Sequence, residues 1–119
     1  MLTISKLAKR FGLARATLLY YEREGLLEPV YRAANGYRYY GDAQIGRLQQ
    51  IADFRSYGVP VNDIRELLAR DDTQTHEQIL RKRFAQLETD IQDLRRQQQT
   101  LVAILEQPSA LPQTPMSKE

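Results

Sequence analysis

Four side chains that can donate hydrogen bonds lie close together in residues 14–24: Arg15, Thr17, Tyr21 and Arg23. Guanidinium and hydroxyl groups of this kind bind phosphates and base edges when a helix lies in the major groove of DNA. The chemistry that these residues indicate is therefore recognition of a polyanion, with no covalent bond made or broken.

The sequence contains few of the residues that catalysis and metal binding require. The chain contains no cysteine and a single histidine, His76. Without cysteine no disulfide, thiolate metal site or redox-sensing thiol can form, and one histidine does not make a zinc site in a monomer. No catalytic set of serine, histidine and aspartate can be assembled around His76. We therefore expect no enzyme activity, no cofactor and no metal, and no special function for His76.

Charge is distributed unevenly along the 119 residues. Residues 1–60 contain nine Lys and Arg against five acidic residues, whereas residues 61–119 contain eight against ten. A basic first half indicates a polyanion partner, although ordinary solvated charge produces the same asymmetry. The sequence has neither a signal segment nor a run of roughly 18 apolar residues, so we expect the protein in the cytoplasm.

Two short helices are expected to position the donors. Residues 3–10 have Thr3 as an N-cap and apolar residues at helical spacing, and Gly12 follows them. Residues 14–24 form the second helix, which Gly25 closes. Two short helices joined by a turn that contains glycine predict a helix-turn-helix.

Residues 26–41 have a different character, because Pro29 breaks a helix. The dipeptide Asn35-Gly36 is a hairpin signal, since both residues tolerate positive φ. Strand-favouring residues flank it, with Val30 and Tyr31 before it and Tyr37, Tyr39 and Tyr40 after it. We predict a two-stranded wing here, and we expect Tyr20, Tyr39 and Tyr57 to be core rings.

Two more helices are predicted, at residues 43–57 with Asp42 as the cap and at residues 61–70. The polar run DDTQT then ends a first domain of residues 1–70. Residues 75–107 carry apolar side chains at the spacing of a heptad seam: Leu80, Phe84, Leu87, Ile91, Leu94, Leu101 and Leu105.

A single helix cannot bury such a seam, so residues 75–107 are predicted to be a dimerisation helix that pairs with a second copy of the chain. Gln98 interrupts the seam, and it either fixes the register or lies where the coil frays. Residues 108–119 contain three prolines and are expected to form a disordered tail.

Several of these stretches together resemble the mercury-resistance-regulator (MerR) family of bacterial transcription regulators. They are ISKLAKRFGLARATLLYYEREGLLEP, Arg32 followed by NGYRYY, a helix of the form D-x-x-x-I-x-x-L, and YGVPVNDI. The resemblance covers about residues 2–70, and the heptad helix extends it to about 106. It implies a mainly α fold, with a winged helix-turn-helix DNA-binding domain followed by a long coiled-coil dimerisation helix.

The resemblance also implies a mechanism. Family members are homodimers joined by an antiparallel coiled coil, and they bind promoters whose polymerase-contacting elements are spaced too far apart. They repress by holding the DNA in a form that RNA polymerase cannot use, and they activate when an effector makes the dimer bend and untwist it. By position, the family assigns DNA contacts to Tyr21, Tyr37, Arg38 and Arg55, the wing turn to Asn35 and Gly36, and a frequent wing arginine to Arg32.

The chain departs from the family pattern on the second helix. Ala14 stands where Ser or Thr often caps, and Ala16 and Leu19 stand where Arg, Lys or His is usual, so the operator sequence is left open. Metal and redox branches use cysteines that this chain lacks, which leaves either a small organic effector or none. A second hypothesis is a coiled-coil interaction module that binds proteins or DNA without controlling a promoter.

Overall fold

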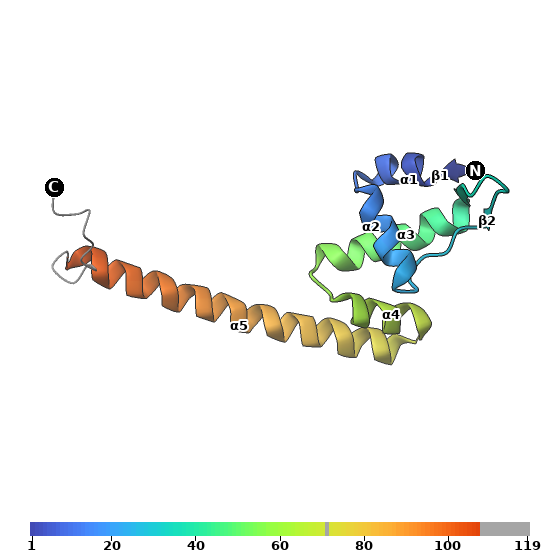
Figure 1. Ribbon diagram of the computed structural model, residues 1–119. Helices are drawn as coiled ribbons and strands as arrows, with labels where there is room; N and C mark the ends of the chain where they lie inside the picture. The colour runs from blue at the N-terminus through green and yellow to red at the C-terminus, as the bar shows by residue number, and fades with distance from the viewer. Residues whose placement is uncertain (71, 108–119) are drawn as a thin grey trace, which may run out of the picture. The chain divides into compact units, whose positions relative to one another are not determined.

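The computed structural model describes residues 1–70 and 72–107. Its elements, labelled in Figure 1, are β1 (Leu2–Thr3), α1 (Ile4–Phe11), α2 (Arg15–Arg23), β2 (Tyr31–Arg32), β3 (Arg38–Tyr40), α3 (Asp42–Ser56), α4 (Val61–Ala69) and α5 (Thr73–Glu106). The expected tail at residues 108–119 lies outside the described residues. None of the described helices is long and apolar enough to cross a membrane.

The chain divides into two compact units, Met1–Arg83 and Phe84–Glu119. The sequence predicts a first domain of residues 1–70 and a dimerisation helix of residues 75–107, and the first compact unit also includes the first turns of α5. The reason is packing: Thr75 and Ile79, on successive turns of α5, are both 7% exposed, and Ile79 joins the hydrophobic core.

The helix-turn-helix predicted from the sequence is confirmed by α1 and α2. The Thr3 hydroxyl accepts a hydrogen bond from the Lys6 N–H and caps α1. Gly12 ends α1 in the left-handed conformation at φ 65°, where glycine carries no steric penalty. Ala14 at the start of α2 makes no side-chain cap, as its methyl group requires. A short turn therefore joins α1 to α2 and sets the direction of α2.

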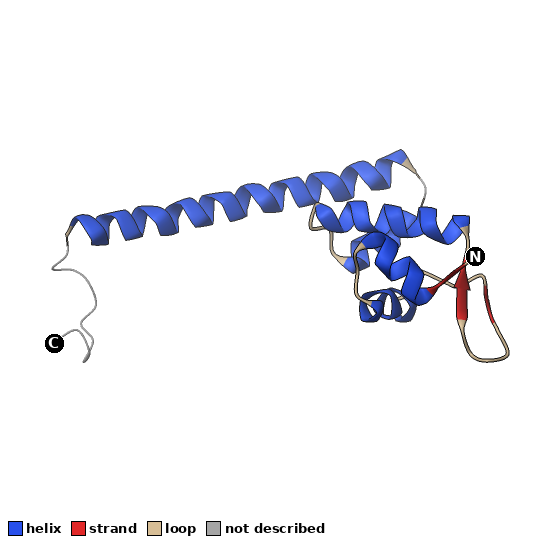
Figure 2. Cartoon of the chain, turned by 90° about the horizontal axis from the view of Figure 1, so that it is seen from above, coloured by secondary structure: helices blue, strands red, loops and turns tan. Residues whose placement is uncertain are grey.

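The wing is a sheet of three strands in the order β1-β3-β2, all antiparallel. Figure 2 shows the strands in red beside the N-terminus. The pairing of Tyr31 with Tyr39 confirms the predicted hairpin, whereas the pairing of Leu2 with Tyr40 adds a strand that the sequence did not predict. A strand of two residues is too short for its alternation to be read.

The wing turn is longer than predicted. The Ala33 N–H donates to the Tyr37 carbonyl (2.8 Å) and the Gly36 N–H donates to the Ala33 carbonyl (2.9 Å), so three residues separate the paired positions. Gly36 has φ 86°, and among the described residues only glycines have positive φ, so Asn35 does not adopt the positive φ that it tolerates. Asn35 instead accepts the Tyr37 N–H on its side-chain oxygen (3.0 Å), as is common in turns.

Helices α3 and α4 complete the core of the first unit. Gly41, not Asp42, occupies the cap position of α3, and the Gln44 side chain accepts the Gly41 N–H (2.9 Å). The fully buried side chains are mainly leucines and isoleucines, most of them on helices, and they include Leu7, Leu18, Leu26, Leu27, Leu48, Ile51, Ile64 and Leu67. Each such side chain contributes about 1.5–3 kcal/mol by leaving water.

The tyrosines that are buried are not those expected from the sequence. Tyr40 and Tyr21 are buried, whereas Tyr20 and Tyr57 are exposed, so the prediction that the latter two are core rings is wrong. Tyr39 is half-buried and its ring stacks on that of Tyr31. Tyr20 lies within α2, and Tyr57 is the residue that follows α3.

Helix α5 begins at Thr73, two residues before the predicted start. Both carboxylate oxygens of Asp72 accept hydrogen bonds from Thr75, one from its N–H (2.7 Å) and one from its hydroxyl (2.9 Å). This cap draws the polar residues 73 and 74 into the helix. The same bonds, the backbone one first, lower the pKa of the Asp72 carboxyl below its ordinary value.

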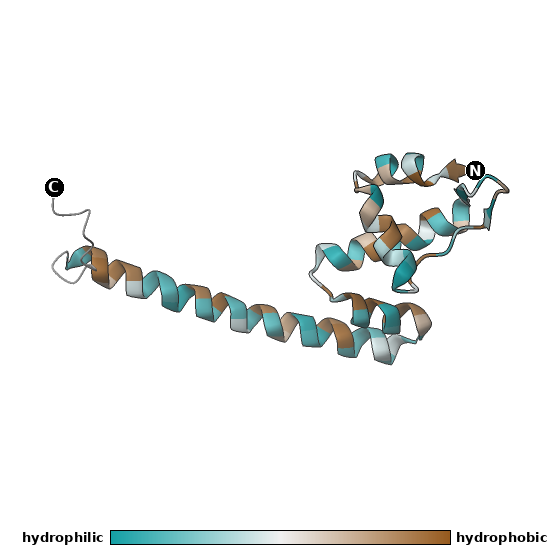
Figure 3. Ribbon diagram, viewed as in Figure 1, coloured by the Kyte–Doolittle hydropathy of each residue, from teal (hydrophilic) through white to brown (hydrophobic). Residues whose placement is uncertain are grey.

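Helix α5 carries a regular apolar stripe from Leu80 to Leu105. Figure 3 shows hydrophobic positions recurring along the helix in brown. The seven predicted seam residues are all exposed, from Leu87 at 39% to Leu105 at 68%. We name these residues (Leu80, Phe84, Leu87, Ile91, Leu94, Leu101 and Leu105) the α5 stripe.

Candidate nucleic-acid interface

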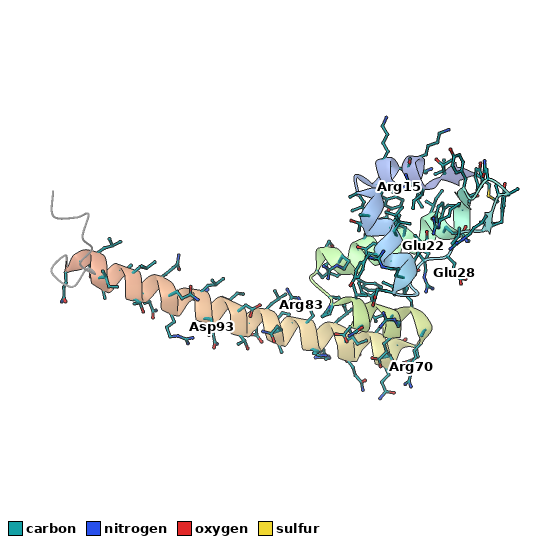
Figure 4. The ribbon with its side chains drawn as sticks, viewed as in Figure 1. Arg15, Glu22, Glu28, Arg70, Arg83 and Asp93 are labelled. Atoms are coloured by element: carbon teal, nitrogen blue, oxygen red, sulfur yellow. The ribbon has the colours of Figure 1, made fainter. Side chains whose placement is uncertain are left out.

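Helix α2 presents most of the predicted donors to solvent. Arg15 and Arg23, at its two ends, are exposed, and Thr17 is half-buried. Tyr20 is also exposed, and the guanidinium of Arg23 lies 5.9 Å from the centre of its ring, within cation–π range. Figure 4 labels Arg15 at the start of this helix. One end of α2 thus offers a charged group beside an aromatic ring.

A hollow runs along one side of α2 and is lined by Ala16, Thr17, Tyr20, Tyr21, Arg23 and Arg55. We name it the α2 hollow. It brings together four of the predicted site residues, one of them, Arg55, from helix α3. The hollow combines two guanidinium groups with hydroxyl groups, a set that suits phosphate oxygens.

Tyr21 belongs to the core through its ring, which leaves the residue 6% exposed. Its hydroxyl makes no hydrogen bond to a described residue, yet no buried polar side-chain atom in the described residues lacks a partner. The hydroxyl must therefore reach solvent, and the residue lines the α2 hollow. The predicted phosphate contact is compatible with this position, although Tyr21 offers only the tip of its side chain.

Arg55 has a structural partner that the sequence did not indicate. One of its terminal nitrogens, Nη1, donates to the Val59 carbonyl (3.0 Å) in the turn after α3. The turn is also held from α5, because Arg83 Nε donates to the Tyr57 carbonyl (2.7 Å). Arg55 therefore faces the α2 hollow from a position that is anchored to the backbone.

A second hollow lies between the start of α1, the start of α2 and the tip of the wing. It is lined by Thr3, Ile4, Ser5, Arg15, Gly36, Tyr37 and Arg38, and we name it the wing hollow. Tyr37 is 60% exposed and cannot contribute to the core. Its exposure and its position beside two arginines favour the predicted contact with a nucleic-acid backbone.

Arg38 is held by an acidic residue of α2. Its Nε donates to Glu22 Oε1 (2.9 Å), and the hydroxyl of the buried Tyr40 donates to Glu22 Oε2. Burial first, and then the bond to Glu22, raise the pKa of Tyr40 well above its ordinary value. Sequence reasoning missed this cluster, since Glu22 lies 16 and 18 residues from its partners and no local spacing indicates the contact.

A third hollow, the outer groove, is lined by Leu19, Glu22, Arg23, Leu27, Glu28, Pro29, Tyr31, Arg32 and Arg38. Arg32 is exposed on β2 and pairs by register with Arg38 on β3. Arg38 lines both this groove and the wing hollow, whereas Arg23 links the groove to the α2 hollow. Helix α2 and the wing therefore form one continuous surface that contains all ten predicted site residues except Asn35, which lies in the adjoining turn.

This surface carries unpaired positive charge. Arg15, Arg23 and Arg32 form no ion pair with any described residue, in contrast to Arg38 and Arg65. Arg65 of α4 pairs with Glu24 (2.8 Å) and also donates to its backbone carbonyl (3.0 Å), which fixes the end of α2. Uncompensated charge at a grooved surface attracts a polyanion.

Residues that hold metals do not gather in the described part of the chain, where no three His, Asp or Glu side chains form a cluster. His76 is part of the packing, because its ring meets the edge of Phe54 and its Nε2 lies 3.3 Å from the Leu67 carbonyl. The site is therefore a binding surface made of arginines and tyrosines on a winged helix-turn-helix, and this arrangement defines a class of DNA-binding protein.

Two family models match the chain. The model described as "MerR HTH family regulatory protein" matches residues 2–71, and the model described as "MerR, DNA binding" matches residues 45–104. The chain belongs to the MerR family, whose members are DNA-binding transcription regulators and not enzymes. The resemblance read from the sequence is confirmed.

Curated relatives agree with this assignment. The regulator CueR of Salmonella typhimurium is 30% identical over 110 residues, which cover 88% of this chain and 80% of CueR. The "Probable heavy metal-dependent transcriptional regulator" of Haemophilus influenzae is 38% identical over 71 residues, covering 60% of this chain and 56% of the relative. The multidrug-efflux transporter 2 regulator of Bacillus subtilis is 30% identical, but the match covers only 40% of it. The chain thus spans about half the length of these last two relatives.

Solved structures share the fold. MtaN, the N-terminal part of the multidrug transporter activator of Bacillus subtilis, superposes with a TM-score of 0.77 at 28% identity, covering 88% of this chain and 98% of MtaN. PbrR691 of Ralstonia metallidurans, solved with lead(II), gives 0.79 at 26% identity and covers 98% and 93%. EcmrR in its DNA complex gives 0.73 at 29% identity and covers 90% and 41%. The predicted fold class is confirmed by these matches.

Proposed function

We propose that this protein binds promoter DNA as a homodimer and distorts the DNA to repress or activate transcription by RNA polymerase. The observation that carries the proposal is the continuous surface of α2 and the wing, where arginines that form no ion pair with a described residue lie beside exposed tyrosines. Helix α2 enters the major groove and the wing lies along the flanking phosphates. The protein acts in the cytoplasm, where bacterial promoters are.

The α5 stripe supports the homodimer. Seven large apolar side chains at heptad spacing are exposed when the chain is alone, and an exposed apolar patch on a protein surface marks a site of interaction with another molecule. A second copy covers the stripe by the same residues, because the spacing is self-complementary. The antiparallel orientation of the pair is taken from the family.

Distortion of the DNA is the step that converts binding into regulation. The dimer holds its two DNA-binding surfaces at a fixed distance, which sets the separation of the two half-sites. The half-sites of a promoter with an over-long spacer reach this separation only when the DNA is bent and untwisted. The energy of deformation is supplied by the additional phosphate contacts. An effector that binds the distorting conformation more tightly shifts the promoter toward activation.

The effector proposed here is a small organic molecule, with regulation by DNA binding alone as the alternative. The relatives and structures above include proteins named for heavy metals and for multidrug transport. Thiolate coordination is not available to the present chain, because its sequence has no cysteine. The residues of this chain therefore suit an organic effector better than a thiolate-bound metal ion.

Footprinting on the DNA upstream of the gene tests this function, with the length of the promoter spacer read from the protected region. We expect a protected palindrome between two polymerase elements that are spaced too far apart. An ordinary spacer with protection over one polymerase element indicates simple repression and contradicts the distortion mechanism.

The second candidate function is an interaction module, and the salt dependence of DNA binding distinguishes it from the regulator. Contacts with phosphates release counterions, so the DNA affinity of a regulator falls steeply as salt rises. A shallow dependence, or binding to a protein with no DNA affinity, favours the module. Arg15, Arg23 and Arg32, which form no ion pair within the described part of the chain, favour the regulator.

A further inference from the structure

Glu22 is an acidic residue in the middle of a basic surface. Its side chain is 10% exposed, and it lies on α2 between the exposed Arg15 and Arg23. A carboxylate at a surface that binds phosphates repels the ligand, and a carboxylate removed from water loses hydration energy. Both costs call for a compensating contact. Figure 4 labels Glu22 together with Glu28, another acid near the same groove.

Both oxygens of Glu22 are occupied by the wing. Oε1 accepts a hydrogen bond from Arg38 Nε (2.9 Å), and Oε2 accepts one from the hydroxyl of Tyr40. Tyr40 is fully buried in the core and lies on β3, two residues after Arg38. The three side chains therefore form a bracket in which the core holds Tyr40, Tyr40 holds Glu22, and Glu22 holds Arg38.

The contact with Glu22 uses only one of the three nitrogens of the Arg38 guanidinium. The two terminal nitrogens make no hydrogen bond to a described residue, and the side chain is 26% exposed. Arg38 lines both the wing hollow and the outer groove. A planar guanidinium that is fixed at Nε presents its other donors in one direction, which prepares it for two-point binding of a phosphate.

We propose that Glu22 is a positioning residue for DNA binding: it orients Arg38 toward a phosphate and holds the wing against α2. The proposal deepens the proposed function, on which it rests. Arg38 without Glu22 keeps its charge but loses its fixed direction, and it must be ordered each time DNA binds. Ordering a long side chain at an interface reduces affinity by a factor of about three to ten.

The sign of the effect separates this role from simple electrostatics. Removal of a negative charge near the DNA increases affinity if charge alone decides, because the net positive charge of the surface rises. Removal of Glu22 decreases affinity if orientation decides. Glu28 supplies the matched control, since it is exposed, lines the same outer groove, and forms no ion pair with a described residue.

The experiment compares Glu22→Gln with Glu28→Gln in equilibrium binding to a promoter fragment and to an unrelated duplex. Glutamine keeps the size of the side chain and removes the charge in both cases. We expect Glu22→Gln to weaken binding about three- to tenfold on both duplexes, and Glu28→Gln to leave it unchanged or slightly tighter. In an Arg38→Ala background, Glu22→Gln should cause no further loss, because there is no guanidinium left to orient.

Equal or tighter binding by Glu22→Gln overturns the proposal. So does an additional loss of the same size in the Arg38→Ala background, since this shows that Glu22 acts elsewhere. Circular dichroism checks the fold of each variant, and titration at DNA concentrations far above Kd counts the DNA-binding-competent fraction, so a partial folding defect does not imitate the effect. If Arg38→Ala itself leaves the DNA affinity unchanged, the proposed contact between Arg38 and a phosphate is wrong. This outcome is distinct from one in which only the positioning role of Glu22 is wrong.

Discussion

Tyr21 buries its ring in the core of the first unit and brings its hydroxyl to the α2 hollow. A ring and a hydroxyl of one residue can thus have separate functions, which a substitution by phenylalanine separates. We expect Tyr21→Phe to leave the unfolding temperature nearly unchanged and to weaken DNA binding about two- to tenfold, the effect of one lost hydrogen bond. Thermal unfolding and fluorescence anisotropy measure the two quantities. A large loss of stability with unchanged affinity would show that the hydroxyl serves the fold.

Arg38 is expected to contact a phosphate and not a base. Arg38→Ala should therefore weaken binding by about the same factor on every DNA sequence, and it should lower the slope of log affinity against log salt by about one. Titrations on three unrelated duplexes at several salt concentrations check this. A loss that appears on a single operator only would place Arg38 at a base edge.

Residues that contact DNA and residues that hold them in place differ in how far the sequence indicates them. Arg15, Tyr37 and Arg38 were predicted because a helix-turn-helix and a wing restrict where donors can lie. Glu22 and Tyr40 were not, since their contact depends on β3 packing beside α2 and the two positions are 18 residues apart. Residues that contact each other only through the tertiary fold produce no periodic pattern in the sequence.

At the scale of elements, the start of α5 depends on one carboxylate. Asp72 accepts two hydrogen bonds from Thr75, and these bonds lower its pKa. A carboxyl whose pKa is lower in the folded state stabilises the fold above its unfolded pKa, and this stabilisation is lost as the pH falls through the folded value. The start of α5 is therefore expected to be more stable at neutral than at acidic pH.

Asp72→Ala tests this cap. We expect the variant to unfold at lower temperature than the parent at pH 7, and the difference to shrink as the pH falls below about 4. Asp72→Asn keeps an acceptor oxygen without a titrating charge, so its stability should depend less on pH in this range. Thermal unfolding of the three proteins between pH 3 and pH 7 provides the measurement. A constant difference between parent and alanine variant would show that the carboxylate charge is not involved.

Elements were predicted well where their signals are local. Thr3, Gly12 and Gly25 end or begin helices through their own backbone and side-chain preferences, so α1 and α2 could be located to within about a residue. The cap of α3 shifted from Asp42 to Gly41, because the Gln44 side chain replaces the usual capping side chain. Strand β1 was missed, since only its pairing with β3 makes it a strand.

At the scale of the whole molecule, the α5 stripe is expected to hold two subunits together. Leu94, at 59% exposed, is in the middle of it. Leu94→Asp places charges from both subunits in an apolar seam and should convert the dimer to monomers, which analytical ultracentrifugation detects. Thr89→Asp adds the same charge on the opposite face of the helix and should leave the dimer intact. A stable Leu94→Asp dimer would mean that another surface joins the subunits.

The stripe was readable from the sequence because heptad spacing is a repeated pattern, and repetition is the strongest signal that a single chain gives. No repeated pattern in the sequence indicates which molecule covers the stripe. The same holds for the effector and the operator, which depend on shapes and contacts made with other molecules. Ala16 and Leu19, where the family usually has basic residues, are the local reason that the operator cannot be inferred from relatives.

A regulator that binds its promoter only as a dimer makes promoter occupancy depend on the amount of protein. When most subunits are single, the number of dimers grows with the square of the subunit concentration. When most promoters are also empty, halving the expression of the gene would reduce the occupied promoters to about a quarter, whereas a regulator that binds as a monomer would lose only half. The exposed leucines of α5 thus give the regulator a threshold in its own abundance, separate from any signal that it senses.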